Sequence, residues 1–276
     1  MIINHNLPGL NALNALNANS QSAQSSMEKL SSGSRINKAA DDAAGLSISQ
    51  KMQAQINGLN QANSNSQDAI SLLQTAEGGL NETQSILQRM NELATQAASS
   101  TNASADSAAI TNELQTLTGE IDHIASSTNF NGNNLLSATG NLTFQIGSSS
   151  NAYDLMTFNL TSIKIGTAQL GLTVGTSISV GTADEAHASI SVITAALQSV
   201  STARSTIGAY QNRLNYAIGN ITTESQNLTT AMSGITDVDM ASEMMNYSKE
   251  NVLQQAAQSM LAQANQNPQQ VLKLLQ

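Results

Sequence analysis

One heptad repeat dominates the pattern of apolar positions along this chain. The repeat places an apolar residue at every seventh position: Ile193, Val200, Ile207, Leu214, Ile221, Leu228 and Ile235. Further apolar residues three positions earlier, at 190, 197, 218 and 232, complete the 3-4 spacing that is typical of coiled-coil packing. We therefore predict one helix beginning near 184–185, with a seam roughly 63 Å long. Arg204, Gln211 and Ser225 also fall on this seam, so it requires long partner helices with some polar positions.

The partner helices are predicted on both sides of this segment. Apolar periodicity favours one helix that ends near 31–33, a second from 41–42 to about 99, and a third over 110–124. A last helix follows Asp237 and runs to about 267. Asp41 and Asp42 are suited to capping the second helix. Gly78 and Gly79, in its middle, indicate either a bend or close packing against a neighbour.

The apolar period changes to two between the third helix and the heptad segment. Residues 142, 144 and 146 and then 153–165 predict two strands around a loop at 148–151, and 170–180 predicts a further β segment. The fold class is therefore mainly α: a long antiparallel α-helical bundle or coiled coil with a small β-hairpin region in the middle of the chain. We expect this β region at the far end of the bundle.

Composition argues for surfaces that other surfaces cover. Charged residues make up 11% of the chain and aromatic residues 3%, and there is no cysteine. The formal net charge is -9 and the few cations are scattered, so neither nucleic acid nor an anionic membrane is an expected partner. The sequence shows no secretory signal and no apolar run of 18 residues. Composition argues against a globular enzyme and favours a chain that assembles with others over a solvated, low-complexity helical protein.

Candidate catalytic or metal-binding groups are sparse. The carboxylate pairs Asp41-Asp42 and Asp237/Asp239 lack a nucleophile or histidine nearby, and helix capping explains them. The histidines at 5, 123 and 187 are isolated and do not have metal-ligand spacing. No enzyme activity and no cofactor are therefore expected. The methionines at 240, 244, 245 and 260 are interpreted as helix-packing residues.

Several short motifs closely resemble those of bacterial flagellin. In family order they are 28–33 (EKLSSG), 41–46 (DDAAGL), 74–78 (QTAEG), 87–90 (LQRM), 129–132 (NFNG), 144–147 (FQIG), 237–241 (DVDMA) and 260–265 (MLAQAN). The resemblance covers nearly the whole chain. It implies a filament subunit that is exported unfolded through the flagellar type III apparatus and polymerises outside the cell for swimming motility.

The resemblance also implies a domain organisation with no variable outer domain. Residues 1–40 and 237–276 would form an inner core domain, and 41–180 with 181–236 an outer core domain. The partners implied are other copies of the chain in a helical homopolymer, the flagellar cap, junction proteins and an export chaperone. A flagellar hook-filament junction protein, which shares terminal helices with flagellin, is the alternative. A signalling helical hairpin would need a membrane anchor or a glutamate-rich region, and neither is found.

Two groups of functional residues follow from the same resemblance. The terminal assembly helices would carry Leu10, Leu13, Met27, Leu30, Val252, Met260, Leu261 and Leu274. A vertebrate Toll-like flagellin receptor would bind Arg89, Leu93 and Glu113. The chain departs from the usual family pattern at Ser34, Ala40, Asn91, Gly234 and Thr236. Three of these departures remove a cation, so salt bridges of relatives are not carried over there.

Overall fold

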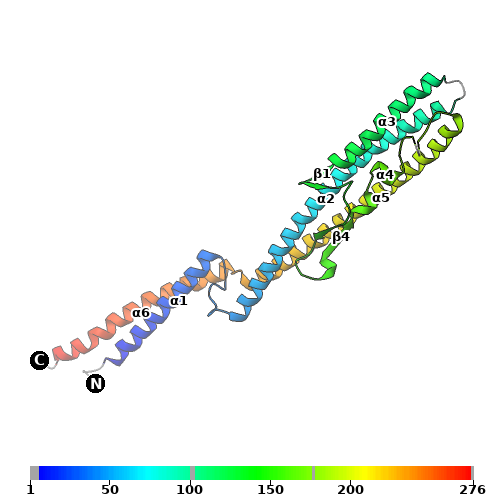
Figure 1. Ribbon diagram of the computed structural model, residues 1–276. Coiled ribbons are helices and arrows are strands. Elements are labelled where there is room, and N and C mark those ends of the chain that lie inside the picture. The colour runs from blue at the N-terminus through cyan, green and yellow to red at the C-terminus, as the bar shows by residue number, and fades with distance from the viewer. Residues whose placement is uncertain (1–5, 100–102, 176–177, 275–276) are drawn as a thin grey trace. The chain divides into compact units, whose positions relative to one another are not determined.

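The computed structural model describes residues 6–99, 103–175 and 178–274, with side chains up to 267 (Figure 1). The chain divides into two compact units, one formed by 1–55 and 226–276 and the other by 56–225. We call them the terminal unit and the central unit. Their boundaries fall inside two long helices, α2 (Ala43–Ala97) and α5 (Ala183–Thr236). The predicted division at 40/41 and 236/237 concerns layers of an assembled filament and stays a prediction.

The terminal unit is built on two antiparallel helices, α1 (Leu7–Ser32) and α6 (Met240–Leu274), which lie side by side in Figure 1. Near the chain ends, Asn6 Nδ2 donates a hydrogen bond of 2.9 Å to the carbonyl oxygen of Ala264. At the other end of the helix pair, Ser34 forms an isolated antiparallel bridge with Asp237. These two contacts fix the antiparallel direction of the pair.

Local sequence signals determine where these helices begin and end. Asn6 Oδ1 accepts a hydrogen bond of 3.0 Å from the amide of Gly9, and Pro8 lies in the first turn, where its missing N–H is not needed. Gly33 ends α1 in a left-handed conformation with φ 69°. α6 was predicted to stop near 267, but it continues to Leu274. Pro268 removes one backbone hydrogen bond from the helix without ending it.

The central unit is organised around α2, α5 and α3 (Ser104–Ser127). Asp42 Oδ1 accepts a hydrogen bond of 2.8 Å from the amide of Gly45, which confirms the predicted cap of α2. α2 continues through Gly78 and Gly79 as one helix. A Cβ added at Gly79 would lie 2.7 Å from Leu136 Cδ1 and 2.8 Å from Thr128 Oγ1, whereas one at Gly78 would meet nothing. Of the two possibilities for this glycine pair, a bend or close packing, the structure shows close packing at Gly79.

The heptad row of α5 supplies one side of the hydrophobic core. Ile193, Val200, Ile207, Leu214 and Ile221 are buried, whereas Leu228 and Ile235 are half-buried. The row packed beside it differs from the expected one. Ser189, Ala196 and Ala203, four residues before the heptad positions, are buried, and Ile190, Leu197 and Arg204 flank them at intermediate exposure. The small side chains let neighbouring elements approach α5 closely.

The polar positions of the seam meet polar partners on α2. Arg204 Nη1 donates a hydrogen bond of 2.6 Å to Gln84 Oε1, and Gln211 Nε2 donates one of 3.0 Å to Glu77 Oε2. Ser225 Oγ lies 3.5 Å from Asn60 Oδ1. Each of these three seam residues therefore faces a polar side chain of α2.

Two small antiparallel hairpins connect α3 with α5. β1 (Asn129–Phe130) pairs with β2 (Asn133–Asn134) through a turn in which Asn131 and Gly132 have φ 50° and 81°. β3 (Asn141–Gln145) pairs with β4 (Leu155–Asn159), with Thr143 opposite Thr157. Short helical turns complete the connection: η1 (Ala152–Asp154), η2 (Leu160–Ile163) and α4 (Thr167–Leu170). The mainly α fold with a small β region is as predicted.

Two strand predictions were wrong in extent. The strand expected to reach 165 ends at Asn159, because the Asn159 side chain accepts a hydrogen bond of 2.9 Å from the amide of Thr161 and starts η2. No regular strand occurs over the described part of 170–180, where Val174 and Ile178 form an isolated bridge. Leu170, Leu172, Ile178 and Val180 are nevertheless buried. This alternating burial imitates the period of a strand although Gly171 and Gly175, both at positive φ, turn the chain.

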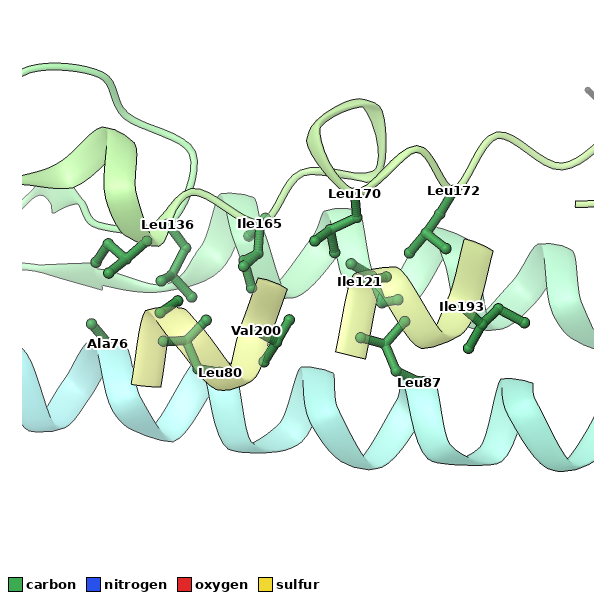
Figure 2. Packing of buried hydrophobic residues seen from close by; sticks show 14 of the residues in the cluster. Ala76, Leu80, Leu87, Ile121, Leu136, Ile165, Leu170, Leu172, Ile193 and Val200 are labelled. Carbon is green, nitrogen blue, oxygen red and sulfur yellow. The ribbon is translucent and has the colours of Figure 1, made fainter. Parts of the chain in front are cut away.

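The β region was expected at the far end of the bundle, but it packs along the side of α2 and α5 (Figure 1). Phe158 on β4 is fully buried and its ring meets that of Tyr210 on α5 edge to face, with centroids 4.9 Å apart. Figure 2 shows apolar side chains from the connection between α3 and α5 pointing toward α2 and α5. Those labelled are Leu136, Ile165, Leu170 and Leu172. These side chains cover apolar surface that a pair of helices would leave exposed.

Candidate functional site

Small side chains fill the contact between α1 and α6. Gly9, Ala23 and Ser26 are the buried residues of α1, and Ala257 and Ala264 are buried on α6. Such residues allow a close approach, but they remove little apolar area from water, and burial stabilises in proportion to that area. Outside this contact, Ile36 is buried next to the start of α2. The helix pair therefore has a very small core of its own.

The large apolar side chains of the terminal unit face outward instead. Of the fourteen large hydrophobic side chains that are exposed among the described residues, eleven belong to this unit: Leu7, Leu10, Leu13, Met27, Ile48, Met240, Met244, Met245, Val252, Leu253 and Met260. The central unit contributes Tyr153, Leu155 and Tyr216. Exposed apolar surface on this scale marks an interaction site. We call the exposed apolar residues of α1 and α6 the apolar surface.

The residues predicted for the terminal assembly helices lie largely on this surface. Leu10, Leu13, Met27, Val252 and Met260 are exposed, with fractions from 40% to 66%. Leu30 and Leu261 are half-buried, and the side chain of Leu274 lies outside the described residues. Sequence reasoning placed Met240, Met244 and Met245 in a packed helix, but they are 48%, 50% and 68% exposed. Adjacent Met244 and Met245 could have signalled this, because neighbouring positions in a helix do not share a face.

Hydrogen bonds join the α1–α2 connection to the α5–α6 connection. We call this contact, formed by residues 33–35 and 235–238, the polar joint. Ser34 Oγ donates a hydrogen bond of 3.0 Å to the carbonyl oxygen of Thr236, and Arg35 Nη2 donates one of 2.7 Å to that of Ile235. Val238 N also donates to the Gly33 carbonyl oxygen at 3.1 Å. Two of the positions that depart from the family pattern, Ser34 and Thr236, thus contact each other.

Charged groups beside the joint are paired with near neighbours. Lys38 Nζ lies 2.7 Å from Glu28 Oε2, and its hydrogen bond to that carboxylate raises the pKa of Lys38. Asp41 Oδ2 accepts hydrogen bonds from the amides of Lys38 and Asn37 at 2.9 and 3.0 Å, which lower the pKa of Asp41. Both carboxylates organise the chain locally. Among the described residues, no three histidines or acidic residues are grouped as metal ligands, and no helix has the length and hydropathy of a membrane span.

The three predicted receptor-binding residues do not share one environment. Arg89 on α2 and Glu113 on α3 are about half exposed and form an ion pair, with Arg89 Nη2 2.9 Å from Glu113 Oε1. Glu92 approaches Arg89 Nη1 at 3.3 Å, and the hydrogen bonds to both glutamates raise the pKa of Arg89. Leu93 is only 2% exposed and belongs to the hydrophobic core. Arg89 and Glu113 therefore form a surface pair above a buried Leu93.

Charge is divided unevenly between the units. The central unit carries twelve Asp and Glu against four Lys and Arg, a formal charge of -8. The terminal unit carries seven against six, a formal charge of -1. The apolar surface therefore lies on the part of the chain that has the weaker electrostatic repulsion between copies.

Comparison with known proteins finds similar sequences along the whole chain. The family model of the bacterial flagellin N-terminal helical region matches residues 3–141, and that of the C-terminal helical region matches 190–275. A flagellin of Halalkalibacterium halodurans is 49% identical over 275 residues, and one of Bacillus subtilis is 45% identical over 307, each covering 100% of both chains. A crystal structure of Bacillus cereus flagellin is 36% identical and covers 61% of this chain and 94% of that one, with a TM-score of 0.49.

The first matched region spans α1, α2, α3 and the β1–β2 hairpin, and the second spans α5 from Ile190 onward and α6. The segment between them, 142–189, holds most of the β3–β4 hairpin, the irregular cover of the central unit and the first residues of α5. Its described residues form no additional domain. Because flagellins match the chain from end to end, the hook-filament junction alternative is not favoured. The chain belongs to the bacterial flagellin family and is a structural subunit of the extracellular flagellar filament, not an enzyme.

Proposed function

We propose that copies of this chain pack together in the filament through the apolar surface of α1 and α6. The observation that carries the proposal is the inverted arrangement of the terminal unit, where small residues are buried between the two helices and large apolar side chains face outward. Further helices from other copies would cover these side chains. Burying one of them contributes roughly 1.5–3 kcal/mol, so several together offset the cost of association.

Contacts of this kind join two different patches, one on each copy, and so continue from copy to copy. A head-to-tail contact that does not close into a ring generates a helical filament. The near-neutral charge of the terminal unit favours close packing there, whereas the acidic central unit would keep part of its surface in contact with solvent. We accordingly assign 1–40 and 237–276 to an inner layer and 41–236 to an outer layer, with the heptad seam of α5 in the outer one.

The terminal helices of a single copy have little to hold them in place. Their contact consists of small residues, and α1 and α6 come from opposite ends of the chain, so pairing them closes a very long loop. We propose that they order fully only on assembly, when the interface compensates the lost entropy. Limited proteolysis should trim roughly the first and last forty residues of the monomer and spare the same residues in filaments. Equal protection in both states would contradict this step.

Export and the remaining partners belong to the same proposal. The chain would pass unfolded through the flagellar type III apparatus, then meet junction proteins and the cap during assembly. Before export, apolar side chains of α6 such as Val252 and Leu253 would be open to other copies, since they are 66% and 40% exposed in the single chain. An export chaperone that covers α6 would prevent premature association between copies.

A second proposal concerns recognition by a vertebrate Toll-like receptor. Its support is the Arg89–Glu113 pair, which brings a guanidinium fork and a carboxylate together on the surface of α2 and α3. Leu93 would act from beneath, by holding the two helices in position. Neighbouring copies would cover the same face in the filament, so the monomer would be the recognised form.

The proposed assembly surface is tested by polar substitution on α6. Val252→Asn and Met245→Gln should each raise the critical concentration for polymerisation about tenfold if each loses roughly 1.4 kcal/mol of contact. The melting of the monomer should not change, because both side chains are exposed there. Gln255→Asn, at an exposed polar position of the same helix, is the matched control and should polymerise normally. Normal filaments from the Val252 and Met245 variants would overturn the proposal.

A further inference from the structure

The ten methionines are divided between the units in the same way as the exposed apolar residues. Met90 and Met156 in the central unit are buried, at 0% and 4% exposure. The eight others belong to the terminal unit, and the exposed ones among the described residues are Met27, Met240, Met244, Met245 and Met260. These five residues are 48% to 68% exposed. One chain therefore carries both shielded and open thioethers.

We propose that Met240, Met244, Met245 and Met260 form a methionine oxidation site that controls assembly. The reactive partner is a peroxide. The sulfur lone pair attacks one peroxide oxygen, and an S–O bond forms as the O–O bond breaks. The leaving hydroxide takes the proton of the new S–OH group, which gives water and the S=O group. Sulfur loses two electrons to the peroxide and the product is the sulfoxide. A thiol-dependent sulfoxide reductase reverses the reaction.

The inference rests on the proposed function, because it requires that other copies cover the apolar surface. Oxidation converts a flexible apolar side chain into a polar one and weakens methionine-rich contacts. A sulfoxide left without a hydrogen bond in the interface loses affinity, on the order of tenfold for each buried group. The thioethers are open in a free subunit and closed in a filament, so the site acts on subunits before assembly.

Their positions on α6 add to the effect. Met240 and Met244 are four residues apart and share a face of the helix, whereas Met245 and Met260 lie on other parts of the exposed side. Oxidation at all four sites would therefore place polar groups around most of the surface that other helices cover. The buried Met90 and Met156 serve as internal references for the reactivity of a shielded thioether.

Hydrogen peroxide footprinting of the full chain tests the inference. Monomers and filaments are treated alike, sulfoxide is located by peptide mass spectrometry, and the critical concentration is measured by sedimentation. In the monomer, the four α6 methionines should oxidise at least about tenfold faster than Met90 and Met156, and oxidised monomer should need at least about a tenfold higher concentration to polymerise. Enzymatic reduction of the sulfoxides should restore assembly.

Leucine variants separate oxidation at these sites from general damage. The four-site change to leucine (M240L, M244L, M245L, M260L) keeps nearly the same volume. Because Met27 can still oxidise, peroxide should raise the critical concentration of this variant, but by much less than that of the unchanged chain. The control M90L/M156L should lose assembly after the same treatment. If the four-site variant does not polymerise before oxidation, M245L and M260L are used singly and should each retain part of the resistance.

The outcomes distinguish the two proposals. If the four methionines are protected in filaments but oxidised monomer polymerises at an unchanged concentration, the inference is overturned and the assembly surface stands. If they oxidise equally fast in filaments and monomers, other copies do not cover α6, and the proposed function itself is overturned. Equal sensitivity of the four-site variant and the M90L/M156L control would also overturn the inference.

Discussion

Arg204 on α5 donates a hydrogen bond of 2.6 Å to Gln84 on α2, within a helix contact whose core is apolar. Its Nη2 also lies 3.8 Å from Glu77 Oε1, and the second oxygen of Glu77 accepts a hydrogen bond from Gln211. Polar residues at single seam positions of a coiled coil fix the register of its helices at some cost in stability. We infer that these contacts set the register of α5 against α2.

Removing the Glu77 carboxylate should therefore destabilise the central unit. Glu77→Leu leaves Gln211 and one side of Arg204 without a partner, which should cost about 1–3 kcal/mol in urea unfolding. The double change Glu77→Leu with Arg204→Leu should recover part of that loss, because apolar replacement of both charges avoids an unpaired cation. Additive losses in the double variant would show that the two residues do not interact.

Two leucines of the same heptad row should differ in their contribution to stability. Leu214 is fully buried and Leu228 is half-buried. Leu214→Ala should lower the free energy of unfolding of the monomer by about 2–5 kcal/mol, and Leu228→Ala by less than about 2 kcal/mol. Thermal and urea unfolding measure both. Equal losses of unfolding free energy in the two variants would contradict the placement of Leu214 in the core and of Leu228 at its edge.

Adjacent glycines in α2 provide a matched pair. Gly78→Ala should stabilise by about 1 kcal/mol, because alanine favours the helix and its Cβ meets no atom within 4 Å. At Gly79 the same change should destabilise by roughly 1–3 kcal/mol, because the Cβ would meet buried Leu136 and the side chain of Thr128. Thr128 cannot easily rotate away, since its Oγ1 donates to the Ile124 carbonyl oxygen at 2.7 Å. A stabilising effect of Gly79→Ala would show that Leu136 and Thr128 do not pack tightly against α2.

Receptor recognition can be tested at the ion pair. Arg89→Ala removes the guanidinium that lies 2.9 Å from Glu113 and should weaken signalling in a reporter-cell assay about tenfold or more. Asn91→Ala, two residues away, should have a smaller effect. Depolymerised protein should activate the receptor, and stabilised filaments should do so poorly. A silent monomer or an equally potent filament would contradict the assignment.

Features that depend on local spacing could be predicted from the sequence. The heptad row of α5, the cap at Asp42 and the end of α1 at Gly33 follow from periodicity and from residue types that favour helix ends. The buried partner row of α5 could not be predicted in this way. Ala196 and Ala203 carry little hydrophobic signal, and their burial depends on how closely other elements approach the helix.

Features that depend on which surfaces meet required the structure. Alternating burial over 170–180 predicts a strand, but glycines turn the chain and the apolar residues reach the core from an irregular segment. Spacing places Arg89 and Leu93 on similar sides of α2, yet α3 packs so that Leu93 is buried and Arg89 is not. The methionines of α6 look like core residues by type, and the absence of a sufficient partner within the chain exposes them.

The most direct test of the account is an electron cryomicroscopy map of the native filament at side-chain resolution. We predict that α1 and α6 contact α1 and α6 of neighbouring copies, and that Met245, Val252 and Met260, exposed in the single chain, are buried between copies. A filament in which these three side chains still face solvent, with the copies joined only through the central unit, would contradict the proposed assembly surface.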